Sequence, residues 1–316
     1  MIVFQFPGQG SQAVGMGGAL AARYASAREV FAEVDEALGQ SLSALMAEGP
    51  AETLTLTENT QPALMAVSMA VVRVLEREFG IGVERAAFVA GHSLGEYTAL
   101  TAAGAFSLAD AARLLKLRGQ AMQRAVAPGA GAMASLIGPK VDIALAEAAA
   151  AEGAKAGICV VANDNNAGNV VISGEAAAVA AAIEAAKGMG ARAIPLSVSA
   201  PFHCPLMAPA GAEMAAALAA ATIHAPKVPV LANVTVAPVT DPDTIRALLV
   251  EQVTGRVRWR ESVTWLADQG ATTFAELGAG AVLTGMSKRI ASGATSLAAG
   301  DPETIEALAA HLAAQA

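Results

Sequence analysis

The chain has 316 residues, of which 54% are hydrophobic and 15% charged, and its formal net charge is −8. This length and composition can bury a large core, which predicts a globular protein with one large domain, or a large domain carrying a smaller one. The negative charge disfavours nucleic acid as a partner. Charges or glycines interrupt the alanine-rich windows before they reach membrane-spanning length, so we expect no membrane anchor. The N-terminus lacks a basic region before an apolar stretch, so we expect no signal peptide.

The first 125 residues alternate short apolar runs with helical patterns, which is the rhythm of an α/β fold. The helix that follows Thr60-Gln61-Pro62 has apolar residues on nearly every side, so we expect it to be buried. The predicted elements are a strand over 2–6, a helix over about 17–38, a helix from Pro62 to Gly80 with Thr60 as its cap, and a strand over 86–90.

Residues 128–198 have a different order of elements, β-α-β-β-α-β, which is the ferredoxin-like arrangement of an inserted subdomain. Its elements are expected over 132–137, 141–152, 158–162, 169–172, 175–187 and 192–198. The α/β rhythm then resumes with strands over 228–234 and 272–277 and helices over 244–253, 261–268 and after 280. We therefore expect a large subdomain of residues 1–127 and 199–316, interrupted by a small one of residues 128–198.

The turn after the first strand, Gly8-Gln9-Gly10-Ser11-Gln12-Ala13, fits the loose form G-x-G-x-x-A of the dinucleotide-binding fingerprint. That fingerprint requires an acidic residue at the end of a second strand about 20 residues further on. Here Glu33 and Asp35 fall within the predicted helix itself. The sequence therefore predicts no dinucleotide cofactor, and the glycines are expected to allow another kind of close approach by the main chain.

Gly91-His92-Ser93-Leu94-Gly95 is the strongest local motif, a G-x-S-x-G between a predicted strand and a predicted helix. A serine on so tight a turn projects from the end of the sheet, and the flanking glycines remove Cβ atoms that would clash. Ser93 is therefore the candidate nucleophile, with a purely structural turn as the alternative. The N–H of Leu94, at the helix start, points to where an oxyanion would form.

A serine nucleophile needs a base, and the chain has four histidines. His311 lies on an amphipathic C-terminal helix, His224 lies between proline-flanked segments, and His92 is within the motif and points away from Ser93. His203 remains, in the proline-pinned loop Pro201-Phe202-His203-Cys204-Pro205 after the last strand of the insert. It is the candidate base, and a histidine that only caps a loop is the alternative.

Arg118 lies on a helix that starts at the capping pair Ser107 and Asp110 and runs to about Val126. On the helical wheel it falls inside the apolar arc, where a buried charge requires a partner. That partner is either an internal carboxylate or the carboxylate of a substrate, held bidentately by the planar guanidinium. The wheel alone does not decide between the two.

The two cysteines, Cys159 and Cys204, indicate neither a disulfide framework nor a four-ligand metal site, so a reduced, cytoplasmic setting is expected. Cys204 adjoins His203 in the sequence, and the two side chains could not easily face one another. A small buried hydrophobic residue is therefore expected at Cys204, in place of a thiol nucleophile.

Together these motifs resemble the malonyl-CoA:acyl carrier protein transacylases of fatty-acid synthesis, which are related to the acyltransferase domains of polyketide synthases. The resemblance covers nearly the whole chain, at family-like spacing. It rests on Phe6-Pro7-Gly8-Gln9-Gly10-Ser11-Gln12, Thr60-Gln61-Pro62-Ala63, Gly91-His92-Ser93-Leu94-Gly95-Glu96-Tyr97, Arg118-Gly119 and Pro201-Phe202-His203-Cys204.

The resemblance implies an α/β-hydrolase-like large subdomain with a parallel sheet, and malonyl-CoA and acyl carrier protein as substrates. Ser93 then resembles the serine that takes the malonyl group, His203 its base, and Arg118 the residue that holds the malonyl carboxylate. Gln9 and Leu94 resemble the main-chain donors of the oxyanion hole. No metal or bound redox cofactor is implied, and monomeric action is expected.

Three further positions follow from the same resemblance. Gln252 matches a glutamine whose main-chain carbonyl orients the histidine, and Asn163 matches a contribution of the insert to the cleft. Phe202, directly before the histidine, favours malonyl over methylmalonyl, because a bulky ring leaves less room for an α-methyl branch.

Three other functions stay open. A serine hydrolase, such as a thioesterase or esterase, usually carries an acidic residue and a late histidine after the serine, whereas His203 lies in mid-chain. A polyketide acyltransferase acting in trans would share the motifs of the resemblance. A catalytically idle module that binds carrier protein is less consistent with the presence of both Ser93 and His203.

Overall fold

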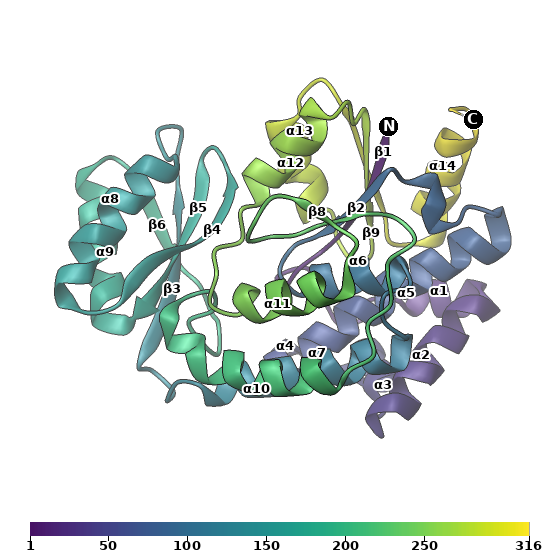
Figure 1. Ribbon diagram of the computed structural model, residues 1–316, viewed down its shortest axis with the longest axis horizontal. Helices are drawn as coiled ribbons and strands as arrows, with labels where there is room; N and C mark the ends of the chain where they lie inside the picture. Colours follow the sequence, from purple (N-terminus) through teal and green to yellow (C-terminus); the bar gives the residue numbers. More distant parts are fainter. Residues whose placement is uncertain (316) are drawn as a thin grey trace.

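The computed structural model describes residues 1–315 and contains two sheets, one on each side of the molecule (Figure 1). The larger sheet has the strand order β10-β9-β1-β2-β7-β8, and its neighbouring strands are parallel except for the pair β7 and β8. These strands are β1 Ile2–Phe6, β2 Phe88–Gly91, β7 Val230–Leu231, β8 Pro238–Val239, β9 Thr273–Leu277 and β10 Thr295–Ala299.

Both faces of the larger sheet are buried, because alternate residues of each strand enter different cores. Phe4 and Val89 face the main core, whereas Val3 and Ala90 face a second core that contains Trp259. The helices around this sheet are α1 Gly18–Arg23, α2 Ala25–Leu38, α3 Leu42–Glu48, α4 Ala51–Thr55, α5 Thr57–Phe79, α6 Leu94–Ala102, α7 Leu108–Arg124, α10 Ala208–Ala220, α11 Pro242–Gln252, α12 Trp259–Asp268, α13 Val282–Ile290 and α14 Pro302–Ala313. Short 3₁₀ turns lie at Val83–Arg85 and Pro205–Met207.

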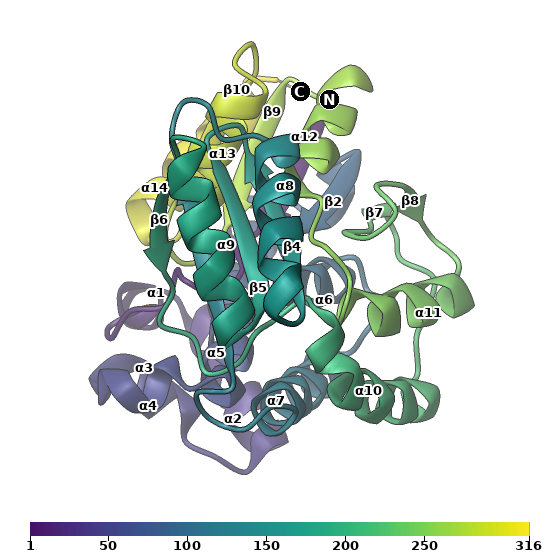
Figure 2. The same ribbon diagram turned by 90° about the vertical axis from the view of Figure 1, so that its left-hand side faces the viewer.

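The smaller sheet is antiparallel, with the order β4-β5-β3-β6, and helices α8 and α9 lie side by side on one of its faces (Figure 2). Its elements follow in the chain as β3 Gly131–Ile137, α8 Ile143–Gly153, a 3₁₀ turn at Ala154–Ala156, β4 Cys159–Asn166, β5 Asn169–Glu175, α9 Ala176–Gly188 and β6 Arg192–Pro195. The expected β-α-β-β-α-β order is confirmed. This part has a hydrophobic core of its own, built mainly from alanine, valine and isoleucine.

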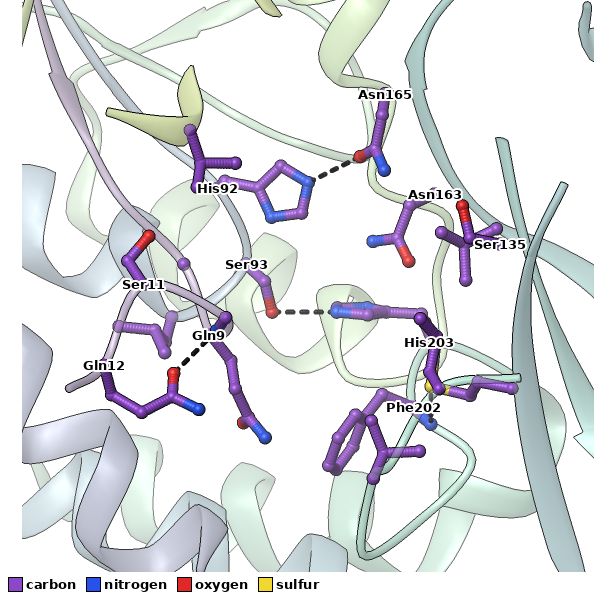
Figure 3. A pocket seen from close by; sticks show the side chains of 18 of the residues that line it. Gln9, Ser11, Gln12, His92, Ser93, Ser135, Asn163, Asn165, Phe202 and His203 are labelled. Carbon is purple, nitrogen blue, oxygen red and sulfur yellow. Dashed lines mark hydrogen bonds between the residues drawn. The ribbon is translucent and has the colours of Figure 1, made fainter. Parts of the chain in front are cut away.

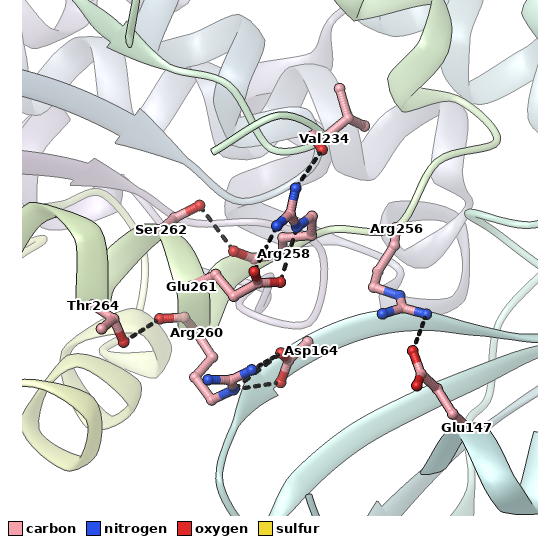
Figure 4. A network of polar contacts seen from close by, with 9 residues as sticks. All are labelled: Glu147, Asp164, Val234, Arg256, Arg258, Arg260, Glu261, Ser262 and Thr264. Carbon is pink, nitrogen blue, oxygen red and sulfur yellow. Dashed lines mark hydrogen bonds and ion pairs between the residues drawn. The ribbon is translucent and has the colours of Figure 1, made fainter. Parts of the chain in front are cut away.

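The two parts are joined where β4 meets the segment before α12. Val257 N–H donates to Ala162 O at 2.8 Å, and Asp164 N–H donates to Val257 O at 3.0 Å. The buried carboxylate of Asp164 also receives two hydrogen bonds from Arg260 Nε, at 3.0 and 3.1 Å (Figure 4). A charge-assisted pair of this kind fixes the direction of β4 relative to α12, and β4 carries Asn163 between these contacts.

Two predicted helices differ from the structure. The helix expected over 17–38 is broken at Tyr24, whose extended main chain (φ −118°, ψ 127°) separates α1 from α2 and lets its ring be buried in the core. Thr60 is not a helix cap, because α5 begins at Thr57 and includes Pro62; the Thr60 hydroxyl donates instead to Leu54 O at 2.7 Å. The prediction that this helix is buried is confirmed.

Two predicted strands are shorter than expected. The strand expected over 228–234 is limited to Val230–Leu231, because Asn233 turns out of the sheet toward Ser93. The strand expected over 192–198 ends at Pro195, although the N–H of Leu196 still donates to Met133 O at 2.9 Å. The helix Ala208–Ala220 and the strand Thr295–Ala299 were not predicted. None of the helices in residues 1–315 has the length and apolar character needed to span a bilayer.

Candidate active site

Ser93 lies on the turn between β2 and α6, as the motif predicts. Its main chain is strained for a non-glycine residue, with φ 54° and ψ −109°. Gly91 and Gly95 permit this turn, since a Cβ atom at Gly91 would collide with the main chain of Gly95, and one at Gly95 with Phe6 O. The serine hydroxyl is therefore presented at the end of the larger sheet, above the start of a helix.

His203 is the histidine next to Ser93, with its Nε2 2.8 Å from Ser93 Oγ (Figure 3). Its Nδ1 lies 3.0 Å from Gln252 O and 3.0 Å from Gly255 O. Carbonyl oxygens only accept, so these contacts place the proton on Nδ1 and leave Nε2 free to accept from Ser93. Burial lowers the pKa of His203 to about 3, and the charge of Arg118 adds to this effect, so the ring is neutral at ordinary pH.

The other three histidines do not contact Ser93 Oγ. His92 Nε2 lies 3.0 Å from Asn165 Oδ1, and its ring packs against Trp259 with the centroids 5.6 Å apart. His224 is exposed, and His311 lies on α14. Cys204 is buried, its thiol donates to Pro201 O at 3.1 Å, and burial raises its pKa, which agrees with the expected small buried residue.

Arg118 is only 1% exposed and lies beside Ser93. Its Nη1 donates to Gln61 Oε1 at 2.9 Å, and its Nη2 donates to Gln252 Oε1 at 2.9 Å and to Ser93 Oγ at 3.1 Å. Its guanidinium also lies 5.6 Å from the centroid of the Tyr97 ring. None of the ion pairs within residues 1–315 includes Arg118. Of the two partners left open by the helical wheel, an internal carboxylate in direct contact is therefore not found in the described chain.

Burial lowers the pKa of Arg118, although a guanidinium remains charged in proteins. The side chains that accept its hydrogen bonds, Gln61, Gln252 and Ser93, are all neutral, and the Glu96 carboxylate acts on it from beyond direct contact. Its charge is therefore less compensated than that of a residue in an ion pair. A carboxylate that entered beside Ser93 would meet a desolvated positive charge with planar donor geometry. The electrostatics of the site thus favour an acyl group that carries its own negative charge.

The predicted oxyanion donors lie on two segments that meet at Ser93: Gln9 in the loop after β1, and Leu94 at the start of α6. Both line the same pocket, and within residues 1–315 neither main-chain N–H donates a hydrogen bond to another protein group. The turn at Gly8 lies against His92 so closely that a Cβ atom there would collide with His92 O. Glycine at position 8 therefore serves the close approach of the first loop to the serine turn.

The pocket in front of Ser93 has a volume of about 410 Å³ and lies between the two sheets. Phe202 and Asn163 both line it, so all the predicted residues except Gln252 border the same cavity. Gln252 lies behind the lining and forms hydrogen bonds with two lining residues, His203 and Arg118. The smaller sheet and the segment 196–198 that follows β6 add an apolar wall formed by Met133, Val171, Leu196 and Val198. The same sheet also contributes the polar side chains of Ser135, Asn163, Asn165 and Asn169.

Sequence reasoning assigned no role to three polar residues that hold this arrangement. Gln61 accepts a hydrogen bond from Arg118. Asn233 accepts one from Ser93 N–H, and Glu96 in turn accepts one from Asn233 N–H. Gln61 and Glu96 were within quoted motifs, so their position was visible although their contacts were not. No sequence pattern marked Asn233, because it lies within the continuous strand predicted over 228–234.

Comparisons with known proteins agree with this arrangement. Residues 3–305 match the model of the acyl transferase domain family. The malonyl CoA-acyl carrier protein transacylase of Escherichia coli strain K12 is 47% identical over 305 residues, which cover 96% of this chain and 97% of that protein.

Solved structures give the same result. The acyl-carrier-protein S-malonyltransferase of Bartonella henselae aligns with a TM-score of 0.96 and 54% identity over 99% of both chains. A malonyl-transacylase solved in complex with a type II polyketide acyl-carrier protein aligns with a TM-score of 0.94 and 41% identity, covering 98% of this chain and 99% of that one. The chain therefore belongs to the acyl transferase family and, within it, to the malonyl CoA-acyl carrier protein transacylases.

Proposed function

We propose that this protein transfers the malonyl group from malonyl-CoA to the phosphopantetheine thiol of an acyl carrier protein, through a malonyl ester of Ser93, and so supplies malonyl groups for fatty acid biosynthesis. One observation carries the proposal. Ser93 Oγ lies within hydrogen-bond distance both of a buried neutral histidine and of a buried arginine that has no carboxylate partner in the described chain.

In the first half-reaction, Ser93 Oγ attacks the thioester carbonyl carbon while His203 Nε2 takes the hydroxyl proton. The oxyanion forms between the N–H groups of Gln9 and Leu94. The bond from the carbonyl carbon to sulfur then breaks, and His203 returns its proton to the CoA thiolate. The second half-reaction runs in reverse order, with the thiol of the carrier protein as nucleophile and Ser93 as leaving group.

Gln252 supports His203 in this scheme, because its main-chain carbonyl accepts a hydrogen bond from Nδ1–H and so keeps Nε2 as the acceptor. Arg118 binds the free malonyl carboxylate and selects against acetyl groups, which leave the buried cation without a partner. Phe202 and Asn163 border the space that the acyl group and its thioester would occupy. Transfer between thioesters involves no net oxidation, and every step is assigned to a protein group, so the proposal includes no metal and no redox cofactor.

The proposal also includes the finer description of the fold. The sheet with Ser93 at the end of β2 is assigned as an α/β-hydrolase-like subdomain of residues 1–127 and 199–316, and residues 128–198 as a ferredoxin-like subdomain. The separate core of the smaller part supports this division. Both cysteines are free and buried, which fits the expected cytoplasmic setting.

The test is a two-stage transfer assay. Intact-mass spectrometry after incubation with malonyl-CoA should show one malonyl group added to the protein, and addition of holo carrier protein should move that group to the carrier. Ser93→Ala should show no added mass, and retained labelling would contradict the assignment of the nucleophile. Release of free malonate in place of transfer would indicate a serine hydrolase.

The same assay separates the remaining alternatives. A parallel measurement with a fatty-acid carrier and a polyketide carrier distinguishes the two pathways, because the preferred carrier should accept the group faster. Binding of a carrier without turnover would indicate an idle binding module.

A further inference from the structure

Glu96 is a buried carboxylate that the reaction scheme does not use. It lies in the first turn of α6, three residues after Ser93, and its side chain is only 2% exposed. Its Oε2 accepts two hydrogen bonds, from Gln252 Nε2 at 2.7 Å and from Asn233 N–H at 3.1 Å. A single buried oxygen thus contacts two residues that each contact Ser93.

The contact with Gln252 determines which way its side-chain amide points. Gln252 Nε2 donates to Glu96 Oε2 and to Ser93 O, at 2.7 and 3.0 Å, and its Oε1 accepts from Arg118 Nη2 at 2.9 Å. An amide turned by half a revolution would place its NH₂ group against the guanidinium, donor against donor. An acceptor at Glu96 therefore keeps the amide oxygen on Arg118.

The contact with Asn233 determines how the main chain of Ser93 is held. Asn233 Oδ1 accepts from Ser93 N–H at 2.8 Å, and its Nδ2 donates to Gly91 O at 2.7 Å. Ser93 has a positive φ, a conformation that persists only where its surroundings enforce it. Its N–H is bound by Asn233 and its C=O by Gln252, and both of these residues are bound by Glu96.

We propose that Glu96 is a positioning residue for the acyl transfer: through Gln252 and Asn233 it holds the strained serine turn and the Arg118 guanidinium in their working geometry. The part that concerns the turn stands on the contacts alone. The part that concerns malonyl selection rests on the proposed function.

The carboxylate acts as a hydrogen-bond acceptor at a fixed distance, and its charge is secondary. Burial raises the pKa of Glu96 to about 7, against the opposing influence of Gln252, Asn233 and Arg118. A neutral acceptor of the same length should therefore serve nearly as well. Shortening the side chain, or removing the acceptor, should not.

Three variants separate these roles. Glu96→Gln keeps the length of the side chain and one acceptor oxygen. Glu96→Asp keeps the charge but shortens the side chain by one methylene, which moves the carboxylate away from its donors. Glu96→Met keeps the volume of the side chain without an acceptor oxygen. The first readout is the rate at which Ser93 is sulfonylated by phenylmethylsulfonyl fluoride, a neutral reagent that requires no carboxylate clamp. The second is the ratio of malonylation to acetylation of Ser93, with the affinity for free CoA measured separately.

We expect Glu96→Gln to stay within about threefold of the wild type, and Glu96→Asp and Glu96→Met to react about 30-fold more slowly, which is the scale of leaving a buried hydrogen-bond donor unsatisfied. The affinity for CoA should not change, and the malonyl preference should fall in the two slow variants. A Met variant as fast as the Gln variant would show that the side chain only fills space, and would overturn the proposal. An Asp variant faster than the Gln variant would show a countercharge to Arg118, and would overturn it equally.

Glu276 provides the matched control. It is also fully buried, and it accepts from Leu283 N–H and Thr284 N–H at the start of α13, with no contact to the serine turn. Glu276→Gln should keep the wild-type sulfonylation rate. If Glu96→Met does not fold, as judged by circular dichroism, the order of the Gln and Asp variants decides. If the wild type takes no malonyl group, the proposed function fails, while the sulfonylation rates still test the role of Glu96.

Discussion

The two sheets border the same pocket but contribute different kinds of surface. The larger sheet presents Ser93 on a turn whose main-chain N–H and C=O are held by hydrogen bonds to Asn233 and Gln252, and helix α7 places Arg118 beside it. The smaller sheet and the segment 196–198 that follows it contribute the apolar wall, which lies next to polar side chains such as Asn163 and Asn165. Reacting groups need fixed positions, and buried hydrogen bonds supply these, whereas an apolar wall limits volume and excludes water. Substitutions on the first side should therefore affect rates, and substitutions beside the wall should affect the choice of substrate.

The largest effect is expected at the base. His203→Ala removes the only histidine that contacts Ser93 Oγ, so the rate of malonyl-Ser93 formation should fall about 10³-fold, as for the loss of a general base. Time-resolved intact-mass spectrometry measures this rate. His224→Ala, which changes an exposed histidine, is the control and should leave the rate unchanged. A loss smaller than about tenfold in His203→Ala would show that another group takes the proton.

A smaller effect is expected at the arginine, and it should appear in selectivity. Arg118→Ala removes the buried cation, so the preference for malonyl-CoA over acetyl-CoA should fall by roughly 10- to 100-fold, the scale of hydrogen bonds between charged groups. The ratio of the two acylation rates measures it. Arg124→Ala, which disrupts only an exposed ion pair with Glu213, is the control. If the malonyl preference is unchanged in Arg118→Ala, Arg118 does not bind the carboxylate.

A still smaller effect is expected beside the apolar wall. Phe202→Ser enlarges the pocket next to His203, so the ratio of methylmalonyl to malonyl transfer should rise by about tenfold, the scale of one methyl group in a shaped pocket. Competition between the two CoA esters measures the ratio. Phe79→Ser, at the far end of α5, should leave it unchanged. A large loss of malonylation rate in Phe202→Ser, with no change in the ratio, would instead assign Phe202 to the positioning of His203.

The smallest change is expected on acidification. A histidine acts as a base only when neutral, and burial lowers the pKa of His203 to about 3. As the pH is lowered from about 8 to about 5, the rate of Ser93 acylation should therefore show no decrease with an apparent pKa of about 6.5, the ordinary value for histidine. Because burial raises the pKa of Glu96 to about 7, the profile is repeated in Glu96→Gln, which removes the ionisation of this carboxyl from the measured range. If the acylation rate of that variant still decreases with an apparent pKa near 6.5, His203 is protonated more easily than its burial implies.

The sequence predicted the elements near Ser93 well, because their signals are local. A strand, a glycine-flanked serine and a helix start leave the main chain few other conformations, and the β-α-β-β-α-β order of the insert was visible from periodicity. The break at Tyr24 was not predictable, since no glycine or proline marks it and only burial of the ring in the core explains it. The short strand β7 was overestimated for the same reason: the contact between Asn233 and Ser93 is tertiary.

By itself the sequence determined the candidates for the chemistry of the site: a serine on a forced turn, one histidine left after elimination, and an arginine on an apolar helix face. It left open what the arginine faces, because a helical wheel gives direction without neighbours. Only the tertiary structure placed Arg118 against Gln61, Gln252 and Ser93. It also brought Glu96 and Asn233 together behind the turn from segments 137 residues apart. Such contacts depend on how the strands are ordered in the sheet, and no local pattern in the chain records that order.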